Sequence, residues 1–371
     1  MKITGSRRAA VLIGVALLLS ACTSAQPSTS ATSATAASPV ATPPPASTPT
    51  TAPTPAPAPT PTPTPAPLTE RLTSPDANTR LVAVREVAGW ADVAAVPILV
   101  TASTDDDLAV GIAAIEGLGA IGGPEATAAL LAFVAEIPDD TDQDASGRAI
   151  AAVMGLGKVR GAAAIARLLE LEADDTTPAD LSVGTMAALA ALEPADVPDL
   201  GKALKHRDAA VVVGAIHHLT SIGTAAAIDL VIGQIQSKSG TVRSAAIGDL
   251  ALVGGLRATP ALVKALAVKQ TYSAATAALV QMHGGEATPL LRYLKSATTI
   301  RVYTAIIRIG QDGTEGALST ALAKFGYKTM ALDYLNCGNP ALDKAARQWA
   351  SRHGYYVVTT PGAVGTVAWG R

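Results

Sequence analysis

The side chains that could perform chemistry in this sequence are few and widely spaced. The five histidines are His206, His217, His218, His283 and His353. Adjacent His217 and His218 point to different faces of a helix, and none of the five has a metal-binding spacing. The sequence also lacks a nucleophile elbow, a phosphate-binding loop, a zinc motif and paired carboxylates. It therefore predicts a chain that is not an enzyme and has no metal site and no cofactor.

Two acidic runs require an explanation. In DDTDQDASG, residues 139 to 147, Asp140, Asp142 and Asp144 alternate as in a calcium loop, but Ala occupies the sixth and twelfth positions, which should be Gly and Glu. We therefore expect a solvated loop between repeats, with a weak extracellular calcium site as the alternative. The second run, Asp105 to Asp107, is expected at a helix N-terminus, where carboxylates accept N–H bonds and oppose the helix dipole.

The first of two cysteines follows an apolar run. Basic residues precede the uncharged residues 9 to 20, which have about the length of a secretory signal and are too short to span a bilayer. The sequence LSAC, residues 19 to 22, resembles the bacterial lipobox. The resemblance implies a signal peptide over residues 1 to 21 and an acylated Cys22 that anchors the chain on the extracytoplasmic face of the cell membrane. Cys337 is then the only thiol, which we expect to be a small buried hydrophobe.

Residues 23 to 69 contain no charged side chain, and 14 of the 25 prolines lie between Pro27 and Pro67. Such a segment cannot bury enough apolar surface to fold, and alternating prolines favour extended polyproline II. We predict a disordered Pro/Thr/Ala linker over residues 22 to 68. Its Thr and Ser content also suits O-glycosylation.

Apolar residues recur through the remaining chain at intervals of 27 to 38 residues. The recurring positions are Val87, Leu118, Leu156, Leu189, Leu219, Leu250, Leu279 and Ile306. The residue three positions later is apolar in all eight cases, and of the residues three positions earlier only Thr276 is plainly polar. Spacing of three places these side chains on one helical face, so each unit contains an amphipathic helix.

Each unit also carries a turn and a second helix. The turns include the glycine pairs at residues 122, 254 and 284, and ATP at 258 to 260 and 287 to 289 predicts a proline in the first turn of the next helix. Two short helices cannot bury a core alone, so neighbouring units must stack. The sequence predicts an all-α protein, an α-solenoid of about eight two-helix repeats.

This pattern resembles the short HEAT-like repeats of the bilin-lyase type, over roughly residues 70 to 330. Two units depart from it, the third by the insertion IPDDTDQDAS and the fourth by Glu193-Pro194 in place of a turn glycine. We assign residues 69–330 to the solenoid and 331–371 to a C-terminal cap. Residues 335 to 355 resemble the terminal helix of bacterial HEAT-repeat lipoproteins, and residues 356 to 371 fit either an extended strand or a disordered tail.

Charge is distributed unevenly, although the formal net charge is only −2. Residues 70 to 199 hold 22 acidic and 7 basic residues, whereas residues 200 to 371 hold 8 acidic and 18 basic residues. One interpretation is that the charges only keep two faces solvated. The other is that the basic residues form part of a surface for an anionic partner. The residues proposed for that surface are Lys202, Lys205, Arg207, Arg243, Lys264, Lys269, Arg292, Lys295, Arg301 and Arg308.

We therefore expect a membrane-anchored extracytoplasmic scaffold that binds a protein or an anionic envelope polymer through its repeat surface. Nucleic acid is not expected, because no aromatic residues interleave the basic ones. The oligomeric state is left open. Two alternatives remain: a lyase-like or small-ligand-binding protein, which the family resemblance alone suggests, and a purely structural component of the cell envelope.

Overall fold

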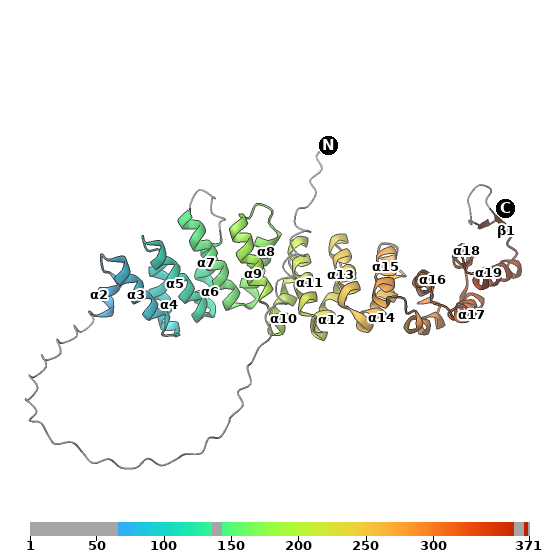
Figure 1. The fold of residues 1–371 in the computed structure, drawn as a ribbon, viewed down its shortest axis with the longest axis horizontal. Coiled ribbons are helices and arrows are strands. Elements are labelled where there is room, and N and C mark those ends of the chain that lie inside the picture. Colours follow the sequence, from blue (N-terminus) through green and yellow to red (C-terminus); the bar gives the residue numbers. More distant parts are fainter. Residues whose placement is uncertain (1–65, 136–142, 360–366, 370–371) are drawn as a thin grey trace, which may run out of the picture. The chain divides into compact units, whose positions relative to one another are not determined.

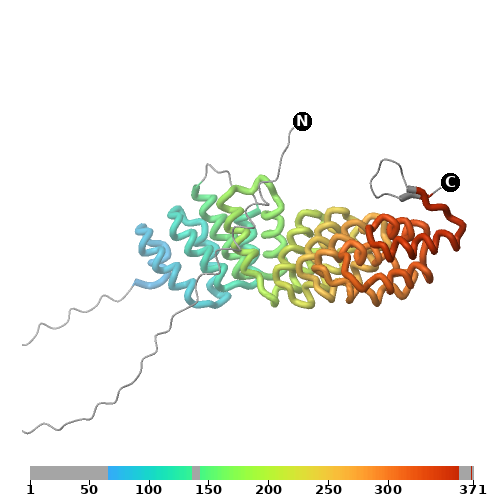
Figure 2. Tube along the Cα trace, turned by 45° about the vertical axis from the view of Figure 1, so that its right-hand side comes forward, coloured from blue at the N-terminus to red at the C-terminus, as the bar shows by residue number. Residues whose placement is uncertain are grey.

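The computed structural model describes residues 66–135, 143–359 and 367–369. Over these ranges the chain is an α-solenoid of antiparallel helix pairs stacked one after another (Figures 1 and 2). A short helix, α2 (Leu68–Leu72), precedes the first pair. Cys22, the predicted signal peptide and nearly all of the predicted linker lie outside the described residues. None of the helices within those ranges is long and apolar enough to span a membrane.

The predicted repeat period is confirmed, because all eight recurring apolar residues lie in the first helices of successive pairs. Each of these residues is at most 1% exposed. The first helices are α3 (Ala77–Ala88), α5 (Leu108–Ile121), α7 (Gln143–Val159), α9 (Ala179–Ala190), α11 (Ala209–Ile222), α13 (Gly240–Val253), α15 (Tyr272–His283) and α16 (Tyr303–Ile309). The residues three positions later sit at helix ends and remain partly exposed, as Trp90 and Val253 show.

The second helices form the other layer of the stack. They are η2 (Val93–Ala95) with α4 (Val96–Ala102), α6 (Gly123–Phe133), α8 (Gly161–Ala173), η3 (Pro194–Asp196) with α10 (Val197–Ala203), α12 (Ala225–Gln234), α14 (Gly255–Ala265), η4 (Thr288–Lys295) and α17 (Glu315–Phe325). A further short helix, η5 (Ile300–Val302), leads into α16.

The ends of the first helices follow from their capping residues. Asp107, Asp208 and Ser239 accept hydrogen bonds from backbone N–H groups of the first turn, which have no partner within the helix. Gly223 and Gly284 end α11 and α15 with φ of 67° and 52°, a left-handed conformation that glycine adopts without steric cost. Caps and glycines therefore fix where each helix pair turns.

Neighbouring first helices approach closely where small residues face each other. A Cβ at Gly119 of α5 would lie 2.6 Å from the Cα of Gly155 in α7, and one at Gly157 would lie 2.7 Å from the Cβ of Ala188 in α9. Apart from α8 and α10, the second helices of neighbouring pairs touch each other much less. The tightest packing therefore runs along the layer of first helices.

One prediction about the turns is wrong. The sequence placed Pro260 in the first turn of a second helix, but α14 begins at Gly255, and Pro260 is its sixth residue. Gly254 accepts a hydrogen bond from the Ala258 N–H, so an additional helical turn precedes the proline. Pro289 does lie in the first turn of η4, as expected.

The regular stacking changes between the fourth and fifth pairs. There α11 packs against α8, a second helix, whereas α9 packs against α7 and α8. Gly214 of α11 lies at this contact: a Cβ there would lie 2.8 Å from Glu172 Oε2 and 3.1 Å from a methyl group of Leu169, both at the ends of side chains. We call the contact between these two helices, with the side chains that bridge it, the α8–α11 junction.

The two irregular units predicted from the sequence flank this junction. The insertion in the third unit lies mostly within residues 136–142, outside the described residues. In the fourth unit, Glu193 closes a capping box with Asp196 instead of a glycine turn. Arg160, at a φ of 58°, pairs with both carboxylates at 2.8 and 3.3 Å and so ties the third pair to the fourth.

The C-terminal region contains two helices where the sequence predicted one. These are α18 (Lys328–Leu335) and α19 (Pro340–Arg352), separated by a turn in which Gly338 has a φ of 80° and Asn339 caps α19. Of the two alternatives for the tail, the described residues are extended: β1 (Val357–Thr359) pairs antiparallel with β2 (Val367–Trp369). Lys328 Nζ lies over the rings of Tyr355 and Trp369, at 5.0 and 5.8 Å.

Candidate functional site

The acidic run at Asp105 to Asp107 is structural. Asp107 accepts hydrogen bonds from the N–H groups of Ala109 and Val110, which confirms the predicted helix N-terminus. Asp105 instead forms a bidentate ion pair with Arg80 of the preceding pair, at 2.7 and 2.8 Å. The hydrogen bond from Arg80 lowers the pKa of the Asp105 carboxyl. Asp105 therefore connects two units, and Asp107 caps its own helix.

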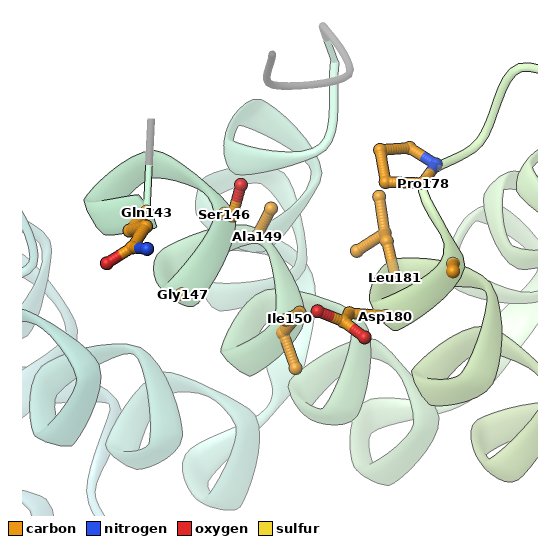
Figure 3. Close-up of a pocket in the computed structure, with 9 residues that line it drawn as sticks. Gln143, Ser146, Gly147, Ala149, Ile150, Pro178, Asp180 and Leu181 are labelled. Atoms are coloured by element: carbon orange, nitrogen blue, oxygen red, sulfur yellow. The ribbon is translucent and has the colours of Figure 1, made fainter. Parts of the chain in front are cut away.

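Part of the acidic run at residues 139 to 147, predicted as a solvated loop with a calcium site as the alternative, lies outside the described residues. Asp140 and Asp142 lie outside the described residues, and Asp144 lies in the first turn of α7. Within the described part of the chain, no three His, Cys, Asp or Glu side chains come together as a metal site. A cavity of about 460 Å³ lies nearby, between the N-terminal ends of α7 and α9 (Figure 3). Asp180 is the only ionisable side chain among its described lining residues, so the cavity offers no acid–base pair.

Three histidines meet carboxylates at or beside the α8–α11 junction, which the sequence did not reveal. His217 Nδ1 lies 2.7 Å from Asp249 Oδ2, and His218 Nε2 lies 3.3 Å from Glu172. His206 Nε2 lies 3.3 Å from Glu170 Oε1. The hydrogen bond with Asp249 raises the pKa of His217, and nearby negative charge adds to this effect. Each partner is 32 or more residues away in sequence, so no local motif could have shown these pairs.

Cys337 is partly buried and packs against the core, in accordance with its predicted structural role. Its thiol donates a hydrogen bond to the Tyr334 carbonyl at 3.1 Å. The thiol is therefore hydrogen-bonded within its own turn of the chain.

The ten basic residues predicted to form one surface lie in three different settings. Lys205, Arg207 and Lys269 lie on loops between pairs, Lys202, Lys264, Arg292 and Lys295 lie on second helices, and Arg243, Arg301 and Arg308 lie on η5 or first helices. The Arg243 side chain is held at the start of its own helix, because it donates hydrogen bonds to the carbonyls of Ser237 and Lys238. The structure therefore does not bring all ten together.

The loop residues do form a periodic set. Lys205, Lys238 and Lys269 are exposed, and each comes one to three residues before the N-cap of a first helix. Lys238 was missed in the sequence analysis, although its position before Ser239 was a usable signal. The matching loops of the first half carry Asp105 and Asp106.

A second cavity, of about 600 Å³, lies between α15, α16 and α18. Its lining residues are Tyr272, Thr304, Ile307, Arg308, Thr329, Asp333, Asn336 and Cys337. Of these, the sequence analysis had singled out only Arg308 and Cys337. Tyr303, a large polar residue at a core position of the repeat, donates a hydrogen bond to Asp333 of this lining. It was the feature of the sequence that could have indicated the cavity.

Two segments, residues 65–151 and 197–282, match the family model for HEAT repeats. This chain carries HEAT repeats. The unmatched residues between them contain the end of α7 together with α8 and α9, which is where HEAT-repeat stacking gives way to the α8–α11 junction. No curated protein matches the chain.

Several solved structures are similar to this HEAT-repeat chain. The complex of CpcE and CpcF of phycocyanin lyase from Nostoc sp. PCC7120 shares 20% identity, covering 65% of this chain and 93% of the other, with a TM-score of 0.29. Human deoxyhypusine hydroxylase shares 18% identity over 58% of this chain and 83% of its own, with a TM-score of 0.26. A Kap121p mutant shares 14% over 76% and 36%, with a TM-score of 0.34. Likenesses this distant carry no information on activity or partners.

Proposed function

We propose that this chain is a membrane-anchored extracytoplasmic scaffold that binds an anionic protein or envelope polymer through its repeat surface and catalyses no reaction. The anchor in this proposal is the acylated Cys22 suggested by the lipobox resemblance. The HEAT-repeat fold supports a scaffold role, because stacked repeats present one extended surface. The main support for the anionic-partner surface is the row of exposed lysines on successive loops of the second half.

The row has the features of an electrostatic docking surface. Lys205, Lys238 and Lys269 each stand one repeat apart on the same kind of loop, so a polymer with regularly spaced charges would meet several at once. The side chains of these three lysines have no hydrogen bond or ion pair to another described residue. Exposed cations in a row act mainly by raising the rate of encounter with an anionic partner, and salt screens that effect.

The proposal can be tested by crosslinking capture from intact cells. The full anchored chain is compared with a triple variant, Lys205→Glu, Lys238→Glu and Lys269→Glu, and captured partners are identified by mass spectrometry. A matched control reverses three exposed basic residues elsewhere, Lys324→Glu, Lys344→Glu and Arg352→Glu. Loss of one discrete anionic partner in the loop variant alone would support the proposal, and equal capture by all three proteins would refute the loop surface.

The anchor requires a separate experiment. Mass spectrometry of the chain purified from membranes should show a fatty-acylated cysteine at the N-terminus, and Cys22→Ser should release the chain from the membrane fraction. Retention of the variant on membranes would contradict the anchor and leave the loop surface untouched.

A further inference from the structure

The cavity between α15, α16 and α18 lies beside a short first helix. α16 has 7 residues, whereas the other first helices have 12 to 17. The chain before it forms η5, a 3₁₀ turn, so the layer of first helices is hollowed at this unit. A volume of about 600 Å³ lies within the range of small-ligand sites.

One wall of the cavity carries the Asp333 carboxylate, which a buried tyrosine holds in place. Tyr303 is 1% exposed, and its hydroxyl donates a hydrogen bond to Asp333 Oδ2 at 2.5 Å. Burial strongly raises the pKa of Tyr303, so the phenol keeps its proton and remains a donor. Edge-to-face contacts with Tyr327 and Tyr334 fix the ring. Asp333, which lines the cavity, is therefore oriented by a rigid group.

The opposite charge is supplied by α16. Arg308 lines the same cavity and is exposed, and no hydrogen bond or ion pair joins its side chain to another described residue. It does not pair with Asp333. The remaining lining includes the Tyr272 ring, Ile307 and the Asn336 side chain, which provide an apolar body and a polar end.

From this arrangement we infer that the cavity binds a ligand that carries both a carboxylate, held by Arg308, and an ammonium group, held by Asp333. Charge-assisted hydrogen bonds are roughly twice as strong as neutral ones, so a ligand bearing both charges fits this pair better than a neutral polyol. This pair of charges has two sources: a free amino acid, or the C-terminal lysine of a peptide, whose ammonium group is on the side chain. The inference does not depend on the lysine loops of the proposed docking surface.

Calorimetric titration of the full chain tests the inference with four probes. These are free L-lysine, acetyl-Ala-Ala-Lys, the same peptide as its C-terminal amide, and acetyl-Ala-Ala-norleucine. Binding of lysine alone identifies the free amino acid, and binding of the acid peptide identifies a peptide end. The amide lacks the carboxylate and the norleucine peptide lacks the ammonium group, so each should bind about tenfold more weakly than the acid peptide.

Variants then assign the binding to the cavity. Arg308→Gln and Asp333→Asn should each weaken binding about tenfold or more, and Arg292→Gln, an exposed arginine that does not line the cavity, should leave it unchanged. Asp333→Asn keeps an oxygen that can accept the Tyr303 hydrogen bond, and circular dichroism checks its fold. Failure of the wild-type chain to bind lysine or the acid peptide would overturn the inference. Binding that neither Arg308→Gln nor Asp333→Asn weakens would also overturn it.

Discussion

Regular steps of the array and the α8–α11 junction hold neighbouring helices together by different means. At the step from α5 to α7, glycine backbones face each other, and a Cβ added at Gly119 would lie 2.6 Å from the Cα of Gly155. At the junction, the atoms closest to Gly214 are the ends of the Glu172 and Leu169 side chains. Backbone cannot move aside without separating two helices, whereas a side chain can rotate. The comparison suggests that regular steps are rigid and that the junction tolerates change.

The largest expected effect tests this contrast with one substitution made at both places. Gly119→Ala should destabilise the chain by about 1 to 3 kcal/mol, because the added methyl group forces α5 and α7 apart. Gly214→Ala should be neutral or stabilise by up to about 1 kcal/mol, because alanine favours the helix and only flexible atoms must move. Urea unfolding of both variants measures the difference. Equal losses at the two sites would break the comparison.

The next effect concerns pH at the junction. Because Asp249 raises the folded-state pKa of His217 above its ordinary value of about 6.5, the pair stabilises the fold fully below that value. This stabilisation is lost as pH rises through the raised pKa. Asp249→Asn should therefore destabilise more at about pH 5.5 than at about pH 9. Urea titrations of wild type and variant at both pH values provide the check, and Asp229→Asn, whose partner is Arg257, should show no such pH dependence.

A smaller effect would sharpen the description of the regular steps. Thr276 is 1% exposed at a position where five of the other seven units carry Val or Ile, and its hydroxyl donates only to the Tyr272 carbonyl of its own helix. Thr276→Val should stabilise by about 0 to 1 kcal/mol, because that bond within the helix contributes little. A shift of the thermal midpoint to lower temperature would show that the hydroxyl matters to the packing of α15.

The smallest effect belongs to the exposed loops. Lys238→Glu should change the free energy of unfolding by no more than about 0.5 kcal/mol, because the side chain has no partner among the described residues. A loss above 1 kcal/mol in urea unfolding would give Lys238 a structural role and weaken its assignment to a docking surface.

The repeat positions could be predicted because a period of apolar residues is a local property of the sequence. Val87 and its seven counterparts are buried because each helix face must meet a neighbour. The pairing of His217 with Asp249 could not be predicted in this way, since it depends on which helices become neighbours. Likewise, nothing near Asp333 in sequence shows that Tyr303 lies beneath it. The insertion and Glu193-Pro194 did mark the irregular region, but they did not indicate that α11 would pack on α8.

The change of packing at the α8–α11 junction has a consequence for how the protein unfolds. In a linear array each unit is stabilised by its neighbours, and cooperativity passes from one unit to the next through their shared interface. An interface in which a first helix rests on a second helix transmits this coupling differently from the glycine contacts that join α5, α7 and α9. The array should therefore melt as two blocks, one carrying most of the acidic residues and the other most of the basic ones. The two blocks would then carry net charges of opposite sign.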